Sequence, residues 1–148
     1  MDGLRGYEAV SVELSRRFAA SLGLHSTDAS ALLAILDAEE RGESLSPARL
    51  SERIGLTSGA TSSLLNRLEE AGHIERSRVH SDRRVVTLHS TPDVQKIAGA
   101  FFEPLQGHVD AMMNAYPDEL LQQFEAFLGD LRSTMDAYMQ DLSAADRV

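Results

Sequence analysis

The chain has 148 residues, of which 43% are hydrophobic and 25% charged, a composition typical of a globular domain with one core. The absence of cysteine excludes disulfides, thiolate zinc sites and thiol redox sensing. No apolar run reaches the roughly 18 residues of a membrane span. The N-terminal segment MDGLRGYEAV has no apolar core of a secretory signal, so we expect a cytoplasmic protein.

The positive charge of the chain is concentrated in one segment. The formal net charge is −9, yet residues 49–89 carry seven arginines against five acids, so this segment is +2 and the remainder is −11. An acidic protein binds nucleic acid poorly through its surface as a whole, because affinity for phosphate grows with the number of cations presented. A local basic surface on an acidic body can still orient the protein toward an anionic partner.

Two helices are predicted in the N-terminal part of the chain. Residues 7–20 place apolar side chains at helical spacing, and Gly23 follows as a stop signal. Residues 28–41 form a second helix with a wide apolar face, for which Thr27 is the predicted N-cap. Gly42 ends this helix.

Two shorter helices follow, each with a start signal. Ser46 is a predicted N-cap for a helix over 47–54, because proline at the first helical position loses no hydrogen bond. Thr57 is the predicted N-cap of a helix over 58–71, and Gly72 closes it. The order helix, glycine turn, helix is that of a helix-turn-helix.

The pattern then changes to that of strands. Residues 73–76 and 84–89 are predicted strands, joined by a loop over 77–83. A hairpin placed after a helix-turn-helix is a wing, whose loop can enter the minor groove beside the major groove that holds the helix.

Two long helices are predicted at the C-terminal end. One begins at Thr91-Pro92, and Pro104 inside it is expected to kink or interrupt it. The other begins at Pro117 and carries apolar side chains at steps of three and four. This stripe favours pairing of the first and last helices with a second copy, and packing on the same chain is the alternative.

The predicted fold class is therefore mainly α with a small β-hairpin wing. We predict a winged helix-turn-helix DNA-binding domain over 27–90, and a helical dimerisation domain formed by 1–26 and 91–148. The predicted partners are double-stranded DNA and a second copy of the chain.

The helix over 58–71 is predicted to present one face to DNA. With Leu64 at the centre of the inward side, Ala60 and Ala71 lie within about 40° of it at 100° per residue. Small polar side chains lie opposite and suit a major groove about 12 Å wide; a merely solvated face is the alternative. Among them, only Asn66 has the groups for a bidentate contact, to adenine. The predicted contacts of this helix are Ser58, Gly59, Thr61, Ser62, Ser63, Asn66 and Arg67.

Two further predictions concern arginines, one near the end of this helix and the others in the wing. The Arg67 guanidinium is expected to reach a phosphate, and an intrahelical pair with Glu70 is the alternative. An arginine at a loop tip suits the narrow minor groove of A·T-rich DNA, and Arg84 is favoured over Arg83 for it. The predicted wing contacts are His80, Ser81, Arg83 and Arg84, with Asp82 and Arg76 as supports.

The segments LSPARLSERIGLTSGATSSLLNRLEEAGHIER (45–76) and SDRRVVTL (81–88) carry a family resemblance. In order and spacing they resemble the MarR (multiple-antibiotic-resistance regulator) family of winged-helix transcription factors. The resemblance implies a homodimer joined by its terminal helices, which binds pseudo-palindromic operators, usually as a repressor. It also implies that Arg84 is the wing arginine and Asp82 its support. Val79-His80 departs from the pattern, which has an acidic residue early in the wing loop.

The resemblance implies a further partner. Many members release DNA when a small, often aromatic, molecule binds between the dimer domain and the winged domain. The candidate ligand-binding residues are Phe18, Phe101, His108 and Met112, for which ordinary core packing is the alternative.

Other chemistry is poorly represented in the sequence. The five histidines are scattered without metal-ligand spacing, and there is no nucleophile elbow or glycine-rich phosphate loop. We therefore expect no metal, no cofactor and no enzyme activity. The alternative function is a winged-helix module that binds protein, which predicts apolar residues on the outward face of the helix over 58–71.

Overall fold

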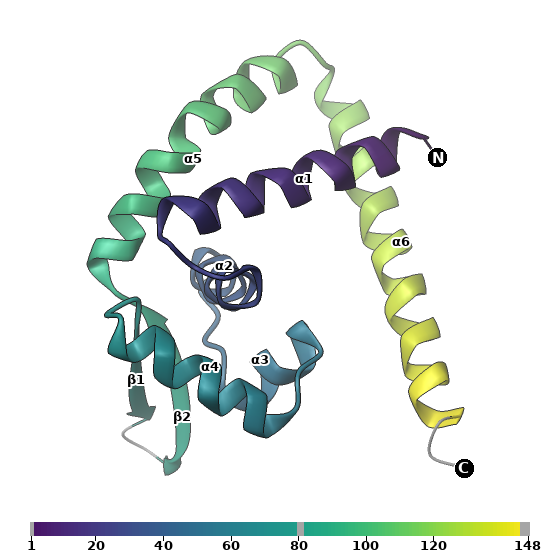
Figure 1. The fold of residues 1–148 in the computed structure, drawn as a ribbon. Coiled ribbons are helices and arrows are strands. Elements are labelled where there is room, and N and C mark those ends of the chain that lie inside the picture. The colour runs from purple at the N-terminus through teal and green to yellow at the C-terminus, as the bar shows by residue number, and fades with distance from the viewer. Residues whose placement is uncertain (1, 80–81, 146–148) are drawn as a thin grey trace. The chain divides into compact units, whose positions relative to one another are not determined.

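The computed structural model describes residues 2–79 and 82–145, and the side chains of 2–78 and 86–142 among them. The described chain contains six helices and one hairpin, which confirms the predicted fold class (Figure 1). It divides into two compact units, one up to Phe102 and one from Glu103. The elements are α1 (Asp2–Ser21), α2 (Ser26–Glu40), α3 (Pro47–Ile54), α4 (Ser58–Glu70), β1 (Ile74–Val79), β2 (Asp82–Ser90), α5 (Pro92–Met113) and α6 (Asp118–Ala145).

The start signals of the two short helices are confirmed. The side chains of Ser46 and Thr57 each accept a hydrogen bond at 3.3 Å from the backbone N–H three residues later. Gly55 ends α3 in the left-handed region, at φ 67°, and so lets the chain turn directly into α4. The predicted cap at Thr27 is wrong, because α2 begins two residues earlier than predicted, at Ser26, with His25 as N-cap and no side-chain cap bond.

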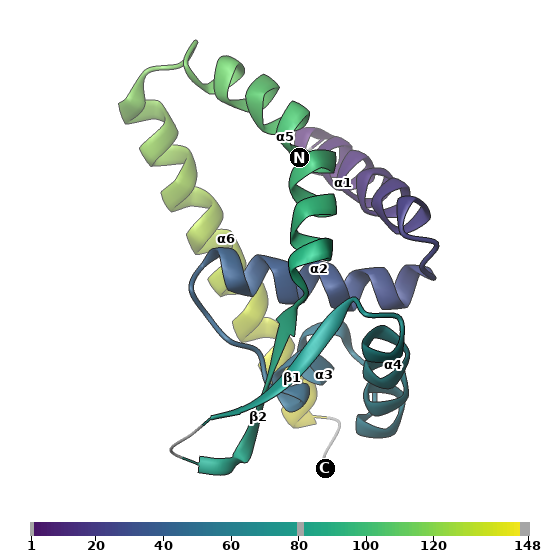
Figure 2. The same cartoon turned by 90° about the vertical axis from the view of Figure 1, so that its left-hand side faces the viewer.

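The hairpin is longer than the sequence predicts. Its two antiparallel strands pair regularly from Ile74 opposite Ser90 to Arg78 opposite Val86, and the next pair is Val79 with Asp82. In Figure 2 the hairpin begins next to one end of α4 and runs away from the helix, and both belong to the first unit. Backbone pairing between Leu45 and Leu88, with an N–O distance of 2.8 Å, adds a third short segment to the base of the hairpin.

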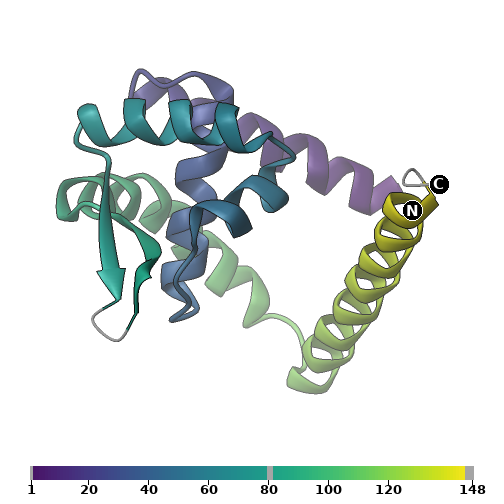
Figure 3. The same ribbon diagram turned by 90° about the horizontal axis from the view of Figure 1, so that it is seen from below.

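A carboxylate fixes the base of the hairpin to α2. Glu39 accepts the backbone N–H of Ser90 at 3.0 Å and also the Ser90 hydroxyl. Gln95 of α5 donates to the same hydroxyl at 3.0 Å. The end of the hairpin and the start of α5 are therefore held on α2, while α3, α4 and the hairpin lie on one side of the unit (Figure 3).

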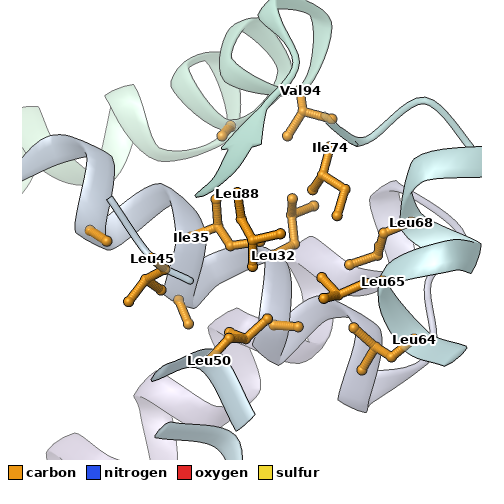
Figure 4. Close-up of a cluster of buried hydrophobic side chains, with 14 of the residues drawn as sticks. Leu32, Ile35, Leu45, Leu50, Leu64, Leu65, Leu68, Ile74, Leu88 and Val94 are labelled. Carbon is orange, nitrogen blue, oxygen red and sulfur yellow. The ribbon is translucent and has the colours of Figure 1, made fainter. Parts of the chain in front are cut away.

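One hydrophobic core holds the first unit together. Leu32 and Ile35 of α2 lie at its centre, with leucines of α3, α4 and β2 around them (Figure 4). Phe18 brings α1 into this core, since it is fully buried and its ring lies 5.4 and 5.2 Å from those of Phe101 and Phe102. The compact unit is thus wider than the predicted winged segment 27–90. The assignment of the terminal helices to a dimerisation domain stays a prediction.

The two C-terminal helices begin as the sequence predicts, at Pro92 and directly after Pro117. Pro104 does not interrupt α5, which runs through it without a break. No single described helix is long and apolar enough to cross a membrane; only α1 and α2 counted together, across a bend of 102°, meet those limits.

Candidate nucleic-acid interface

The orientation of α4 differs from the one predicted. Its buried side chains are Thr61, Leu64, Leu65 and Leu68, so its inward direction lies about 50° away from Leu64 at 100° per residue. Ala60 and Ala71, which the sequence assigned to the core face, are exposed. The large Leu65 side chain, rather than two small alanines, determines which side of the helix is buried, because it removes more apolar surface from water.

Because α4 is rotated about its axis relative to the prediction, one predicted DNA contact is wrong. Thr61 is only 2% exposed, and its hydroxyl donates to the Thr57 carbonyl at 2.9 Å. Its side chain therefore belongs to the interior and does not present a hydroxyl to a groove.

Five of the predicted residues of α4 remain on its outer side. They are exposed, small or polar, and uncharged, and we call them the recognition face: Ser58, Gly59, Ser62, Ser63 and Asn66. Nothing lies within 4 Å of where a Cβ atom of Gly59 would stand, so the space in front of the helix is open at this position. α4 and the hairpin lie on the same side of the unit (Figure 3). The apolar face that a protein-binding module would need is not found on the described α4.

Arg67 has a partner that the sequence did not indicate. Its Nη2 lies 2.5 Å from Oδ1 of Asp28 and its Nε lies 3.2 Å from Oδ2, so the pair is bidentate. The pair with Glu70, which was the alternative to a phosphate contact, is thus replaced by a pair with Asp28 at the start of α2. The carboxylate side chain is 6% exposed and the guanidinium side chain 55%. The hydrogen bonds to Asp28 raise the pKa of Arg67 above its usual value.

This pair leaves part of the guanidinium accessible. An arginine has five N–H donors, and Asp28 engages those on Nε and Nη2. The predicted phosphate contact of Arg67 stays a prediction. The sequence could not indicate Asp28, because the two residues are 39 positions apart and only tertiary packing brings them together.

Arg76, predicted as a support of the wing, links the hairpin to α4. From β1 its Nη2 donates to Oδ1 of Asn66 at 2.8 Å, and its Nη1 lies 3.5 Å from Oε2 of Glu69. The one residue of the recognition face that could make a bidentate base contact is therefore held by a strand residue.

The remaining wing predictions fall outside what the structure describes. His80 and Ser81 lie outside the described residues, as do the side chains of Asp82, Arg83 and Arg84. The backbone of both arginines lies in the irregular part of β2, between the residues that pair with Val79 and Arg78. Strict alternation of neighbouring side chains, which the sequence argument used, applies only to a regular strand.

The four predicted ligand-binding residues are divided between the two units, and their shared role stays a prediction. Phe18 and Phe101 pack against each other in the first unit, whereas His108 and Met112 are exposed residues of the second. A shallow pocket of about 500 Å³ opens instead between α2 and α3. Its lining residues, none of them predicted, are Ser30, Leu33, Ala34, Asp37, Arg53 and Ile54. Among the described residues no group of three or more His, Cys, Asp or Glu side chains could hold a metal.

Comparison with known proteins supports the family resemblance found in the sequence. Residues 22–85 match the model of the MarR family. The chain is 27% identical over 124 residues to the uncharacterized HTH-type transcriptional regulator YcgE of Bacillus subtilis, over 84% of this chain and 78% of that protein. It is 26% identical over 119 residues to the HTH-type transcriptional repressor YetL of the same organism, over 80% and 70%.

A solved structure has the same fold. MepR of S. aureus in its DNA-binding conformation superimposes with a TM-score of 0.66 at 17% identity, over 89% of this chain and 95% of that one. The family model over residues 22–85, the curated relatives and the winged helix-turn-helix agree, and the resemblance to the MarR family carried by residues 45–76 and 81–88 is confirmed.

Proposed function

We propose that the chain is a transcriptional regulator that binds double-stranded DNA with α4 in the major groove and the hairpin against the adjacent minor groove. The observation that carries this proposal is the recognition face: five uncharged, exposed positions of α4 beside a hairpin, in a chain whose net charge is −9. A slim uncharged face lets the helix enter a groove without repelling phosphates. The MarR family and the DNA-binding conformation of MepR support this proposal.

The N-terminus of α4 suits a phosphate. The first N–H groups of a helix have no intrahelical acceptor. The Thr57 side chain accepts the N–H of Ala60, which leaves those of Ser58 and Gly59 to bind a phosphate oxygen. Such contacts fix the position of the helix, and the outer side chains then read base edges.

We propose that two copies act together on a pseudo-palindromic operator, as a repressor. Exposed apolar side chains recur along α6, among them Phe124, Phe127 and Tyr138, and α1 exposes Tyr7 and Val10. A stripe of this length on two terminal helices is suited to burial against a second copy. Two recognition helices related by a two-fold axis would contact half-sites about 34–36 Å apart. The repressor named among the relatives supports the sign of regulation.

The proposal includes release of DNA by a small aromatic effector. Phe18 has the burial of a core residue, so a ligand would have to displace the ring cluster that it forms with Phe101 and Phe102. We assign the chain a binding role rather than a catalytic one.

A salt titration on duplex DNA tests the proposal. We expect the affinity for random duplex to fall steeply between 50 and 200 mM salt, as it does for proteins that neutralise several phosphates. Selection of bound duplexes from a random pool should then give a symmetric consensus. Absence of binding even at low salt would overturn the proposal in favour of a protein-binding module.

A further inference from the structure

We propose that Arg78 of β1 binds a phosphate of the DNA strand that runs between the groove entered by α4 and the groove next to the hairpin. Arg78 is absent from the contacts predicted from the sequence. The inference rests on the proposed function, because it adds a contact to the same DNA-binding surface. Two observations support it: the pairing of the other arginines, and the face of β1 to which Arg78 belongs.

Three of the five arginines described between residues 49 and 78 are already paired with carboxylates. The pairs are Arg53 with Asp37, Arg67 with Asp28, and Arg76 with Glu69. Among the side chains that the structure describes, Arg49 and Arg78 are exposed and have no ion-pair partner. A paired arginine reaches a phosphate only by sharing or breaking its ion pair, whereas an unpaired arginine has its full charge available.

The alternation of β1 places Arg78 on the side of the hairpin that faces α4. Successive side chains of a strand point to opposite faces, so Ile74, Arg76 and Arg78 share one face. Ile74 is buried in the core, and Arg76 donates to Asn66 of α4 at 2.8 Å. Pairing is regular up to Arg78 opposite Val86, and the register shifts only after this pair. Arg78 is therefore an exposed side chain on the α4 side of the hairpin, about 7 Å beyond Arg76 along the strand.

This position suits the sugar–phosphate backbone that separates two grooves. When α4 lies in the major groove and the hairpin reaches the adjacent minor groove, the DNA strand between the two grooves passes between helix and hairpin. Arg78 lies between the contact of β1 with α4 and the outer end of β1 at Val79. A guanidinium has planar donors that can bind two phosphate oxygens at once. The cross-strand partner of Arg78 is the uncharged Val86, and Glu75 belongs to the opposite face of β1.

The salt dependence of duplex binding tests the contact, because each phosphate that the protein neutralises releases counterions. The slope of log affinity against log salt has a magnitude of about 0.9 for each phosphate contacted. For the full-length protein on random duplex, we expect Arg78→Met to reduce this magnitude by about 0.9 per bound copy. The loss of affinity should then be about threefold larger at 50 mM than at 200 mM salt. A phosphate contact carries no sequence information, so the loss should be equal on random and selected duplexes.

Matched variants separate the contact from charge and from folding. Arg78→Lys keeps the cation and should keep most of the wild-type slope. Arg53→Met removes the same formal charge from the same basic segment, but from an arginine that is paired with Asp37, and should keep the wild-type slope. Arg78→Met should unfold at the wild-type temperature, because the side chain that it replaces is exposed.

The outcomes are distinct. A wild-type slope for Arg78→Met, together with duplex binding by wild type, would overturn this inference and leave the proposed function standing. Equal reductions for Arg78→Met and Arg53→Met would also overturn it, because net charge alone would then explain the effect. A loss confined to selected duplexes would overturn it in favour of a base contact. No duplex binding by wild type at low salt would overturn both the inference and the proposed function.

Discussion

Asp28 is a buried carboxylate whose charge is balanced by one arginine from another helix. The bidentate bond from Arg67 ties the first turn of α2 to the C-terminal half of α4. Removal of the partner of a buried charge is destabilising, because the charge stays without compensation. We expect Arg67→Met to lower the thermal unfolding temperature clearly more than Arg49→Met, which removes the charge of an exposed arginine on α3. Equal unfolding temperatures for the two variants would contradict a structural role for the pair.

The two wing arginines, Arg83 and Arg84, allow a second prediction about single residues. A narrow A·T minor groove has enhanced negative potential, so an inserted arginine binds it better than a G·C-flanked groove. We expect Arg84→Ala to weaken binding severalfold, mostly on A·T-flanked duplexes, and Arg83→Ala to weaken it similarly on both kinds. Competition between the two duplexes measures this ratio. A larger A·T-specific loss for Arg83→Ala would reverse the assignment.

Single residues were predictable where their role follows from local sequence, and not where it follows from packing. The exposure of Ser62 and Asn66 could be derived from the polar spacing of one helix. The bond between Arg76 and Asn66 could not, because it depends on how β1 lies against α4. Thr61 was misassigned because a threonine can satisfy its hydroxyl on the preceding turn of its own helix and be buried.

The rotation of α4 carries a prediction at the scale of the element. Leu65 is buried although the sequence argument placed the centre of the inward face at Leu64, with Ala60 within about 40° of it. We expect Leu65→Ala to lower the free energy of unfolding by about 2–5 kcal/mol, through lost burial and a cavity. Ala60→Ser should change it by less than about 0.5 kcal/mol, as is usual for exposed positions. Urea denaturation measures both values. A large loss at Ala60 with none at Leu65 would restore the original phasing.

Element boundaries were predictable where a cap or a glycine marks them. Ser46, Thr57 and Gly55 determine the ends of α3 and α4, because each satisfies or redirects backbone groups locally. The hairpin extends beyond its predicted ends because its length depends on cross-strand pairing rather than on the composition of either strand. Pro104 did not interrupt α5, since a helix can continue past a proline with the loss of one backbone bond.

At the scale of the whole molecule, both the distribution of charge and the apolar stripe of α6 favour binding of DNA by two copies of the chain in the proposed complex. Residues 49–89 carry +2 and the rest of the chain −11, so an approaching duplex is attracted to one segment and repelled by the others. Such a molecule binds DNA through one surface. A second recognition helix must then come from a second copy.

A substitution in the apolar stripe of α6 tests whether the second copy binds there. Phe127 is 54% exposed in the single chain, and a carboxylate placed there would be buried without a partner in a dimer. We expect Phe127→Asp to shift the protein from dimer to monomer in sedimentation experiments. Ser133→Asp, on the opposite side of α6, should remain dimeric. Because both half-sites contribute to binding, the monomeric variant should also lose most of its affinity for a two-half-site operator, with a smaller loss on an isolated half-site. If Phe127→Asp sediments as wild type does, the apolar stripe of α6 does not form the contact between copies.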